Sequence, residues 1–209
     1  MKFLVTGFGP FPGARRNPTA LLMGALGRQR ARLERFGIEL SCAVLPVDYA
    51  GIPSVLQRLE QTLKPAVIIH FGLAARRKFL SIETRALNRL SALHCDASGE
   101  RTPCRTIIPG APSALQATFP AREMAAALCR AGLCGRPSIN AGNYVCKETL
   151  YLSLARSRAP VIGFIHVPRL RRAGSKKKPA RGIRPTRDDL VRAAMIAILL
   201  GARKLRQVL

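Results

Sequence analysis

Acidic side chains are scarce in this sequence: the 209 residues include 11 Asp and Glu against 35 Lys and Arg, a formal net charge of +24. The scarcity leaves only a short list of carboxylates that could take part in catalysis. The three histidines, His70, His94 and His166, are scattered, and the six cysteines show no Cys-x-x-Cys spacing. A zinc centre needs several such ligands at short, characteristic spacings. We therefore expect no metal site.

Long apolar runs are also lacking, and none approaches the roughly 20 residues that a membrane-spanning helix needs. Residues 1–7 lead directly into a strand and a glycine turn, without the longer apolar stretch and cleavage site of a signal peptide. A chain of this length, 48% hydrophobic, can build a core without disulfides. We therefore expect a single cytoplasmic domain over residues 1–209, with no membrane contact.

Part of the positive charge is concentrated in residues 169–187, which are rich in Lys and Arg and contain no acidic residue. This composition predicts a basic loop, to be followed by a C-terminal helix over residues 186–208. Such a loop is most simply a solvated surface segment, although it could also hold nucleic acid or another anionic partner electrostatically. Because no aromatic residue is interleaved with the basic ones, it offers no stacking platform for bases.

Apolar runs alternate with helix-like segments along the chain. The pattern predicts strands near residues 2–8, 38–47, 66–71, 78–88 and 161–167, and helices near residues 17–36, 52–63, 120–131 and 186–208. Residues 91–117, rich in Pro, Gly and small polar residues, predict a long functional loop. Strands that alternate with helices indicate an α/β fold, here a three-layer α/β/α single domain with a mostly parallel twisted sheet.

A thiol and an imidazole lie on segments that suit a cysteine hydrolase. Cys146 follows a short strand-like run that breaks at Gly142, and a helix-like segment comes next. His166 lies near the end of an apolar strand, which would deliver it to the sheet edge where α/β active sites form. A helix N-terminus and a nearby imidazole both lower the pKa of a thiol. The pattern therefore predicts Cys146 as a nucleophile of lowered pKa and His166 as its base.

The base of such a pair usually needs an acceptor that orients it, and Glu83 is our candidate because its neighbours look buried. The other acidic residues fall mainly on outer or helix-capping positions. Taken alone, a strand histidine is more often a satisfied core residue, and His70 calls for the same caution as His166. Phe8 and Phe11 flank a rigid Gly/Pro turn that could hold them as two walls of a small apolar pocket.

Several blocks of the chain, in a fixed order, resemble the pyroglutamyl-peptidase I (pyrrolidone-carboxyl peptidase) family. The blocks are residues 3–11 with 17–18, 45–47, 70–74, 81–83 with 88, 109–112, 141–146 and 163–168. The resemblance implies a cysteine-type exopeptidase that removes an N-terminal pyroglutamyl residue from peptides through a thioester acyl-enzyme. It implies no metal or organic cofactor, and it suggests a homo-oligomer.

The same resemblance implies roles for individual residues. It implies a catalytic triad of Cys146, His166 and Glu83, the three residues that the sequence pattern also favours. It implies that the pyroglutamyl lactam lies in an apolar pocket, and the residues placed there by position are Phe8, Phe11, Tyr144 and Val145.

Three positions depart from the family pattern near the expected site. Thr84 and Leu93 stand where the family has arginines, and Lys147 stands where an asparagine usually follows the nucleophile. These changes leave two alternatives open. One is a related cysteine hydrolase that acts on another small N-acyl or lactam group. The other is a non-catalytic homologue that binds an anionic partner through the basic loop.

Overall fold

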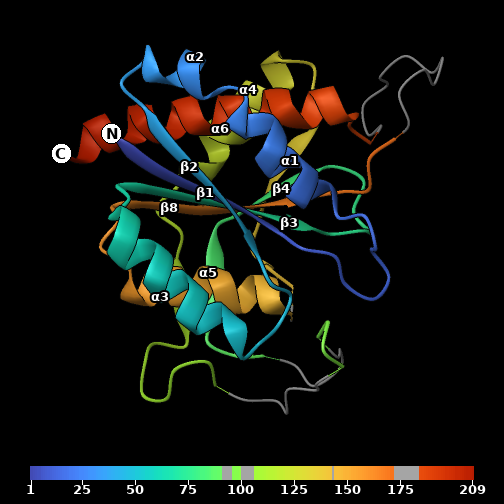
Figure 1. Cartoon of the computed structure of the whole chain (residues 1–209), viewed down its shortest axis with the longest axis vertical. Helices are drawn as coiled ribbons and strands as arrows, with labels where there is room; N and C mark the ends of the chain where they lie inside the picture. The colour runs from blue at the N-terminus through green and yellow to red at the C-terminus, as the bar shows by residue number, and fades with distance from the viewer. Residues whose placement is uncertain (91–95, 100–105, 143, 172–183) are drawn as a thin grey trace.

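A six-stranded sheet forms the centre of the protein, and helices cover both of its faces (Figure 1). The computed structural model describes residues 1–90, 96–99, 106–142, 144–171 and 184–209. The elements are β1 (Lys2–Phe8), α1 (Pro18–Gly27), α2 (Arg30–Glu34), β2 (Glu39–Leu45), α3 (Gly51–Leu63), β3 (Val67–Leu73), β4 (Leu80–Glu83), β5 (Arg85–Leu87), β6 (Ala114–Gln116), α4 (Ala121–Arg130), β7 (Gly135–Ser138), α5 (Val145–Arg156), β8 (Val161–Val167) and α6 (Arg187–Val208).

The strand order in the large sheet is β2-β1-β3-β8-β4-β7, and β5 pairs with β6 in a separate two-stranded sheet. Every neighbouring pair of the large sheet is parallel except β4 and β8, which run antiparallel. The predicted α/β class with a mostly parallel sheet is therefore confirmed. The antiparallel pair has a consequence for the site, because it sets the end of β4 beside the second half of β8.

The apolar core is divided between the two faces of the sheet. Helices α1, α4 and α6 pack on the upper face in Figure 1, and α3 and α5 pack on the lower face. The central strands β3 and β8 are buried on both sides, as continuous apolar runs predict. Within the described residues, no helix has the length and apolar character that a membrane span requires.

Some predicted elements have different boundaries in the structure. The single helix expected over residues 17–36 is two helices, because α1 ends at Gly27 and α2 starts at Arg30. The strand expected just before Cys146 lies earlier in the chain than predicted, since β7 ends at Ser138 and α5 begins at Val145. Strand β7 tolerates Pro137 because it is an edge strand, where a missing N–H is harmless.

Two predicted loops fall only partly within the structure. Of the basic loop at residues 169–187, residues 172–183 lie outside the described residues. Of the long loop at 91–117, residues 91–95 and 100–105 lie outside them, and the described part ends in the short strand β6. Helix α6 follows the first of these loops and begins with a capping box between Thr186 and Asp189.

Candidate active site

The thiol lies in the first turn of α5. Tyr144 is the N-cap residue, Val145 opens the helix, and Cys146 follows it with its side chain partly buried. The Sγ atom faces β3 at Gly72, where a Cβ atom would come within 2.9 Å of it. The helix start therefore holds the thiol against the middle of the sheet, at the C-terminal end of β3.

The imidazole lies beside the same glycine. His166 is the register partner of Gly72 across β3 and β8, and it is 4% exposed. Its Nδ1 lies 2.8 Å from Oε1 of Glu83, the last residue of β4. Because a carboxylate only accepts hydrogen bonds, Nδ1–H donates and Nε2 keeps its lone pair. The structure thus places Glu83 in contact with His166, and it places Cys146 against Gly72, the register partner of His166.

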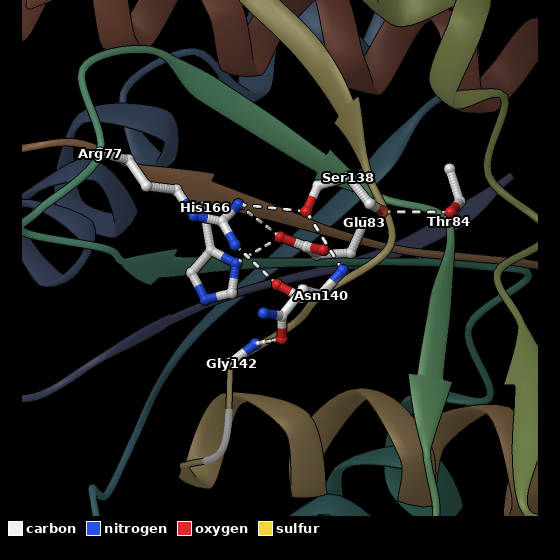
Figure 2. Close-up of polar contacts among 7 residues, drawn as sticks. All are labelled: Arg77, Glu83, Thr84, Ser138, Asn140, Gly142 and His166. Carbon is white, nitrogen blue, oxygen red and sulfur yellow. Dashed lines mark hydrogen bonds and ion pairs between the residues drawn. The ribbon is translucent and has the colours of Figure 1, made fainter.

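Arg77 links the glutamate to the segment that leads to the nucleophile. Its Nη1 donates to Oε1 of Glu83 at 2.7 Å, and its Nη2 donates to the carbonyl oxygen of Asn140 at 2.6 Å. Figure 2 shows the guanidinium next to the His166 ring, with Glu83, Ser138 and Asn140 all on one side of it and joined to it by hydrogen bonds. The sequence did not indicate this residue, because Arg76, Arg77 and Lys78 are adjacent and only the fold decides which one turns inward.

The charges of the dyad follow from these contacts. Burial opposes ionisation of Glu83, but the hydrogen bond and charge of His166, together with Arg77, hold its pKa below the usual value. Burial lowers the pKa of His166, Glu83 partly offsets that effect, and Arg77 adds to it. At neutral pH the pair is therefore an ionised carboxylate and a neutral imidazole, which can accept a proton at Nε2.

The expected lowering of the thiol pKa is wrong for the free protein. Burial, the largest cause, and the negative charge of Glu83 together raise the pKa of Cys146 to about 12. The backbone at the helix start and Arg77 act in the opposite direction without overcoming burial. Cys146 is consequently a neutral thiol at rest, and its proton must leave as the sulfur attacks.

The four residues predicted to bind the substrate belong to one apolar cluster, which also borders Cys146. Phe8 and Val145 are buried in it, whereas Phe11 and Tyr144 pack on it from the outside. The rings of Phe11 and Tyr144 are 6.2 Å apart between centroids. The turn that carries Phe11 is fixed by Asn17, whose side-chain amide donates to the Gly9 carbonyl oxygen at 3.0 Å.

Two further aromatic residues in this cluster were missed by the sequence reasoning. Phe164 is fully buried, and its ring lies 6.1 Å from that of Phe8 and 4.7 Å from the imidazole of His166. Tyr49 follows β2 and lies edge-on to Tyr144, with ring centroids 5.7 Å apart. No signal pointed to Tyr49. Phe164 stands two residues before His166, and that spacing on one strand face could have indicated it.

Metal ligands are not grouped in the described part of the chain, where no three His, Cys, Asp or Glu side chains come together in a way that could hold an ion. The site combines a thiol, an imidazole and a carboxylate. Such a set can transfer an acyl group from an amide to the sulfur and then to water.

Comparison with known proteins agrees with this chemistry. A family model described as pyroglutamyl peptidase matches residues 1–203. The pyrrolidone-carboxylate peptidase of Pyrococcus furiosus is 37% identical over 177 residues, which cover 80% of this chain and 81% of that protein. That of Coprothermobacter proteolyticus is 30% identical over 211 residues, covering 99% of both chains.

Solved structures of similarly named proteins share the fold. A mutant pyrrolidone carboxyl peptidase from Pyrococcus furiosus superposes with a TM-score of 0.85 at 31% identity, covering 98% of this chain and 100% of the other. Pyrrolidone carboxyl peptidase from Thermus thermophilus has a TM-score of 0.81 at 36% identity, covering 94% and 98%. The similarity therefore extends through the sheet and the helices that carry the site.

Proposed function

Because this chain belongs to the pyroglutamyl peptidase family, we propose that it removes N-terminal pyroglutamyl residues from peptides with Cys146 as nucleophile, His166 as base and Glu83 as orienting group. The activity is that of a cysteine-type exopeptidase. The observation that carries the assignment of residues is the contact of 2.8 Å between His166 and Glu83, with the sulfur of Cys146 against Gly72, the register partner of His166.

The reaction begins with transfer of the thiol proton. Nε2 of His166 accepts this proton while Sγ of Cys146 attacks the carbonyl carbon that joins the pyroglutamyl residue to the peptide. Glu83 holds Nδ1–H and stabilises the imidazolium that forms. Because the resting thiol pKa is high, attack and proton transfer occur together rather than from a preformed thiolate.

The oxyanion of the tetrahedral intermediate lies at the start of α5. The first backbone N–H groups of a helix have no partner within the helix and can donate to an oxyanion placed there, although in α5 the Lys147 N–H is bonded to the Tyr144 carbonyl oxygen. One such donor contributes about 3 kcal/mol to transition-state stabilisation in other enzymes. The imidazolium then protonates the leaving amine, and water, activated by the same imidazole, hydrolyses the thioester. No step of this scheme requires a metal or an organic cofactor.

The lactam ring of the substrate fits the apolar cluster beside the nucleophile. Phe11 and Tyr144 are partly exposed at its margin, with Phe8 and Val145 buried behind them, and a five-membered ring without charge buries well against such side chains. A free N-terminal amine would be left without water or a counter-charge in the same place. This difference supports selection of pyroglutamyl over ordinary N-terminal residues.

The compartment and the assembly are further proposals. The cysteines of the described residues, Cys42, Cys129, Cys134 and Cys146, are all free thiols. Because the reaction needs a reduced nucleophile, we place the protein in a reducing compartment such as the cytoplasm. The homo-oligomer and an anionic partner of the basic loop both stay predictions.

The test is hydrolysis of a fluorogenic pyroglutamyl amide under reducing conditions. We expect turnover by the wild type, at least a 10⁴-fold loss in Cys146→Ala, and a loss of about 10²- to 10⁴-fold in Glu83→Gln. Cys129→Ala is the matched control, because Cys129 is an exposed thiol on α4, which covers the opposite face of the sheet from α5. It should keep wild-type kcat/KM.

Two results would redirect the assignment. A folded wild type with an alkylatable Cys146 but no turnover would mean that Thr84, Leu93 and Lys147 have changed the substrate to another small N-acyl or lactam compound. A wild type that neither turns over nor reacts at Cys146 would instead leave the binding of an anionic partner, tested by salt-sensitive retention on nucleic acid.

A further inference from the structure

Tyr49 is held firmly at the edge of the substrate cluster. It lies in the turn between β2 and α3, it is 4% exposed, and its backbone N–H donates to Oδ2 of Asp96 at 3.2 Å. Its ring stands edge-on to that of Tyr144, which comes two residues before the nucleophile. Tyr49 also packs in the same cluster as Phe8 and Val145. Its position is therefore set by main-chain and ring contacts, and its hydroxyl takes no part in them.

The hydroxyl of Tyr49 is buried and has no hydrogen-bond partner within the described residues. Leaving such a group unpaired costs stability, and natural proteins keep the exceptions mainly where a ligand completes the bond. Tyr151, also a buried tyrosine, shows the ordinary arrangement, because its hydroxyl donates to the Pro112 carbonyl oxygen at 2.6 Å. The contrast between the two tyrosines, within the described residues, favours a Tyr49 hydroxyl that bonds to a ligand.

The surroundings of this hydroxyl connect it to the catalytic thiol. Burial is the main cause that raises the pKa of Tyr49, and the neighbouring ionisable groups Tyr144, Glu148, Asp96 and Cys146 raise it further. The group is thus a protonated donor throughout the working range of the enzyme, and it shares an electrostatic environment with Cys146.

We propose that Tyr49 is a specificity-determining residue whose hydroxyl donates a hydrogen bond to the lactam carbonyl oxygen of the bound pyroglutamyl ring. The proposal rests on the proposed function. Of the four proposed walls, Phe8, Phe11 and Val145 carry no side-chain donor, whereas Tyr144 carries a hydroxyl. An apolar pocket discriminates poorly between rings of similar size, whereas a fixed donor rejects a ring that lacks its acceptor.

The first experiment compares Tyr49→Phe with the wild type. We expect kcat/KM for a pyroglutamyl amide to fall about tenfold, mainly through KM, while the melting temperature stays equal or rises because the variant loses an unpaired hydroxyl. Tyr151→Phe is the matched control. Since it removes a bond that the free protein makes, its melting temperature should fall and its kcat/KM should stay that of the wild type.

A second experiment identifies the group that Tyr49 contacts. Calorimetric binding of 2-pyrrolidone is compared with that of pyrrolidine-2-thione, whose sulfur is a much weaker acceptor, in the wild type and in Tyr49→Phe. We expect the loss of the hydroxyl to weaken binding of the lactam about tenfold and to leave binding of the thione nearly unchanged. Equal losses for both ligands, or none for either, would overturn the proposal.

The two experiments separate failure of the proposal from failure of the proposed function. If the wild type hydrolyses the pyroglutamyl amide and Tyr49→Phe matches it, the Tyr49 proposal is wrong and the function stands. If the wild type shows no turnover but binds 2-pyrrolidone through Tyr49, the lactam contact stands and the function is wrong. If the wild type neither turns over nor binds 2-pyrrolidone, both are wrong.

Discussion

At Gly72 the structure of the site leaves no room for a side chain. A Cβ atom at this position would lie 2.6 and 2.8 Å from two ring atoms of Phe164 and 2.9 Å from Sγ of Cys146. Ordinary contacts of a Cβ atom begin at 3.4 Å, so a methyl group is about 0.8 Å too close to the ring and about 0.5 Å too close to the sulfur. Gly72→Ala therefore forces one of these two neighbours to move.

The aromatic ring cannot yield easily. Phe164 is fully buried and packs against Phe8, His70 and His166. The thiol, partly exposed at the start of α5, is the group that gives way. A nucleophile displaced by several tenths of an ångström from its base loses on the order of 10² in rate. Overpacking of the core costs a further 1–3 kcal/mol, roughly, in stability.

The assay is kcat/KM for a fluorogenic pyroglutamyl amide, together with thermal denaturation. We expect Gly72→Ala to lose about 10²-fold in kcat/KM while it remains folded. Gly9→Ala is the control, because Gly9 directly follows the neighbouring strand β1. Its new methyl group would meet only Leu45 O at 3.6 Å and Val44 Cγ1 at 3.9 Å. Wild-type kcat/KM in Gly72→Ala would refute the placement of the sulfur beside this glycine.

Three further predictions concern ionisation. Arg77→Met should lower kcat about 10- to 100-fold. Because Arg77 lowers the pKa of His166, the variant should also move the acid limb of the kcat/KM profile to higher pH. An acid limb that does not move would leave Arg77 a purely structural role. Alkylation of Cys146 by iodoacetamide in the free protein should rise steadily above pH 7, since its pKa is raised to about 12, and a plateau at neutral pH would contradict this. Burial lowers the pKa of His70 to about 3, so below about pH 6.5 the unfolded chain binds a proton that the folded chain does not. The free energy of unfolding should therefore fall by about 1.4 kcal/mol per pH unit from pH 6.5 toward 3. In His70→Asn, the free energy of unfolding measured by urea denaturation should depend less steeply on pH.

His70 also shows how a second histidine serves the fold. Its Nδ1 lies 2.7 Å from Oγ1 of Thr6 on β1, and its Nε2 lies 3.0 Å from Oγ of Ser153 on α5. The ring thus ties the nucleophile helix to the centre of the sheet. The sequence favoured His166 as the base, and the hydrogen bonds of His70 to Thr6 and Ser153 come only from the structure.

The sequence by itself determined the alternation of strands and helices, and hence the α/β class. It also determined a short list of candidates for the site, since a chain with so few acidic residues leaves few choices beside Cys146 and His166. Local pattern suffices for these features because helix and strand periodicity, glycine turns and residue type are written along the chain.

Only the tertiary structure decided which groups meet and how they ionise. The break at Thr84 separates β4 from β5, and the antiparallel pairing of β4 with β8 brings Glu83 to His166. The inward turn of Arg77, the unpaired hydroxyl of Tyr49 and the raised pKa of Cys146 all depend on contacts between distant segments. Burial decides each of these properties, and burial arises from packing across the whole sheet rather than from any local run of residues.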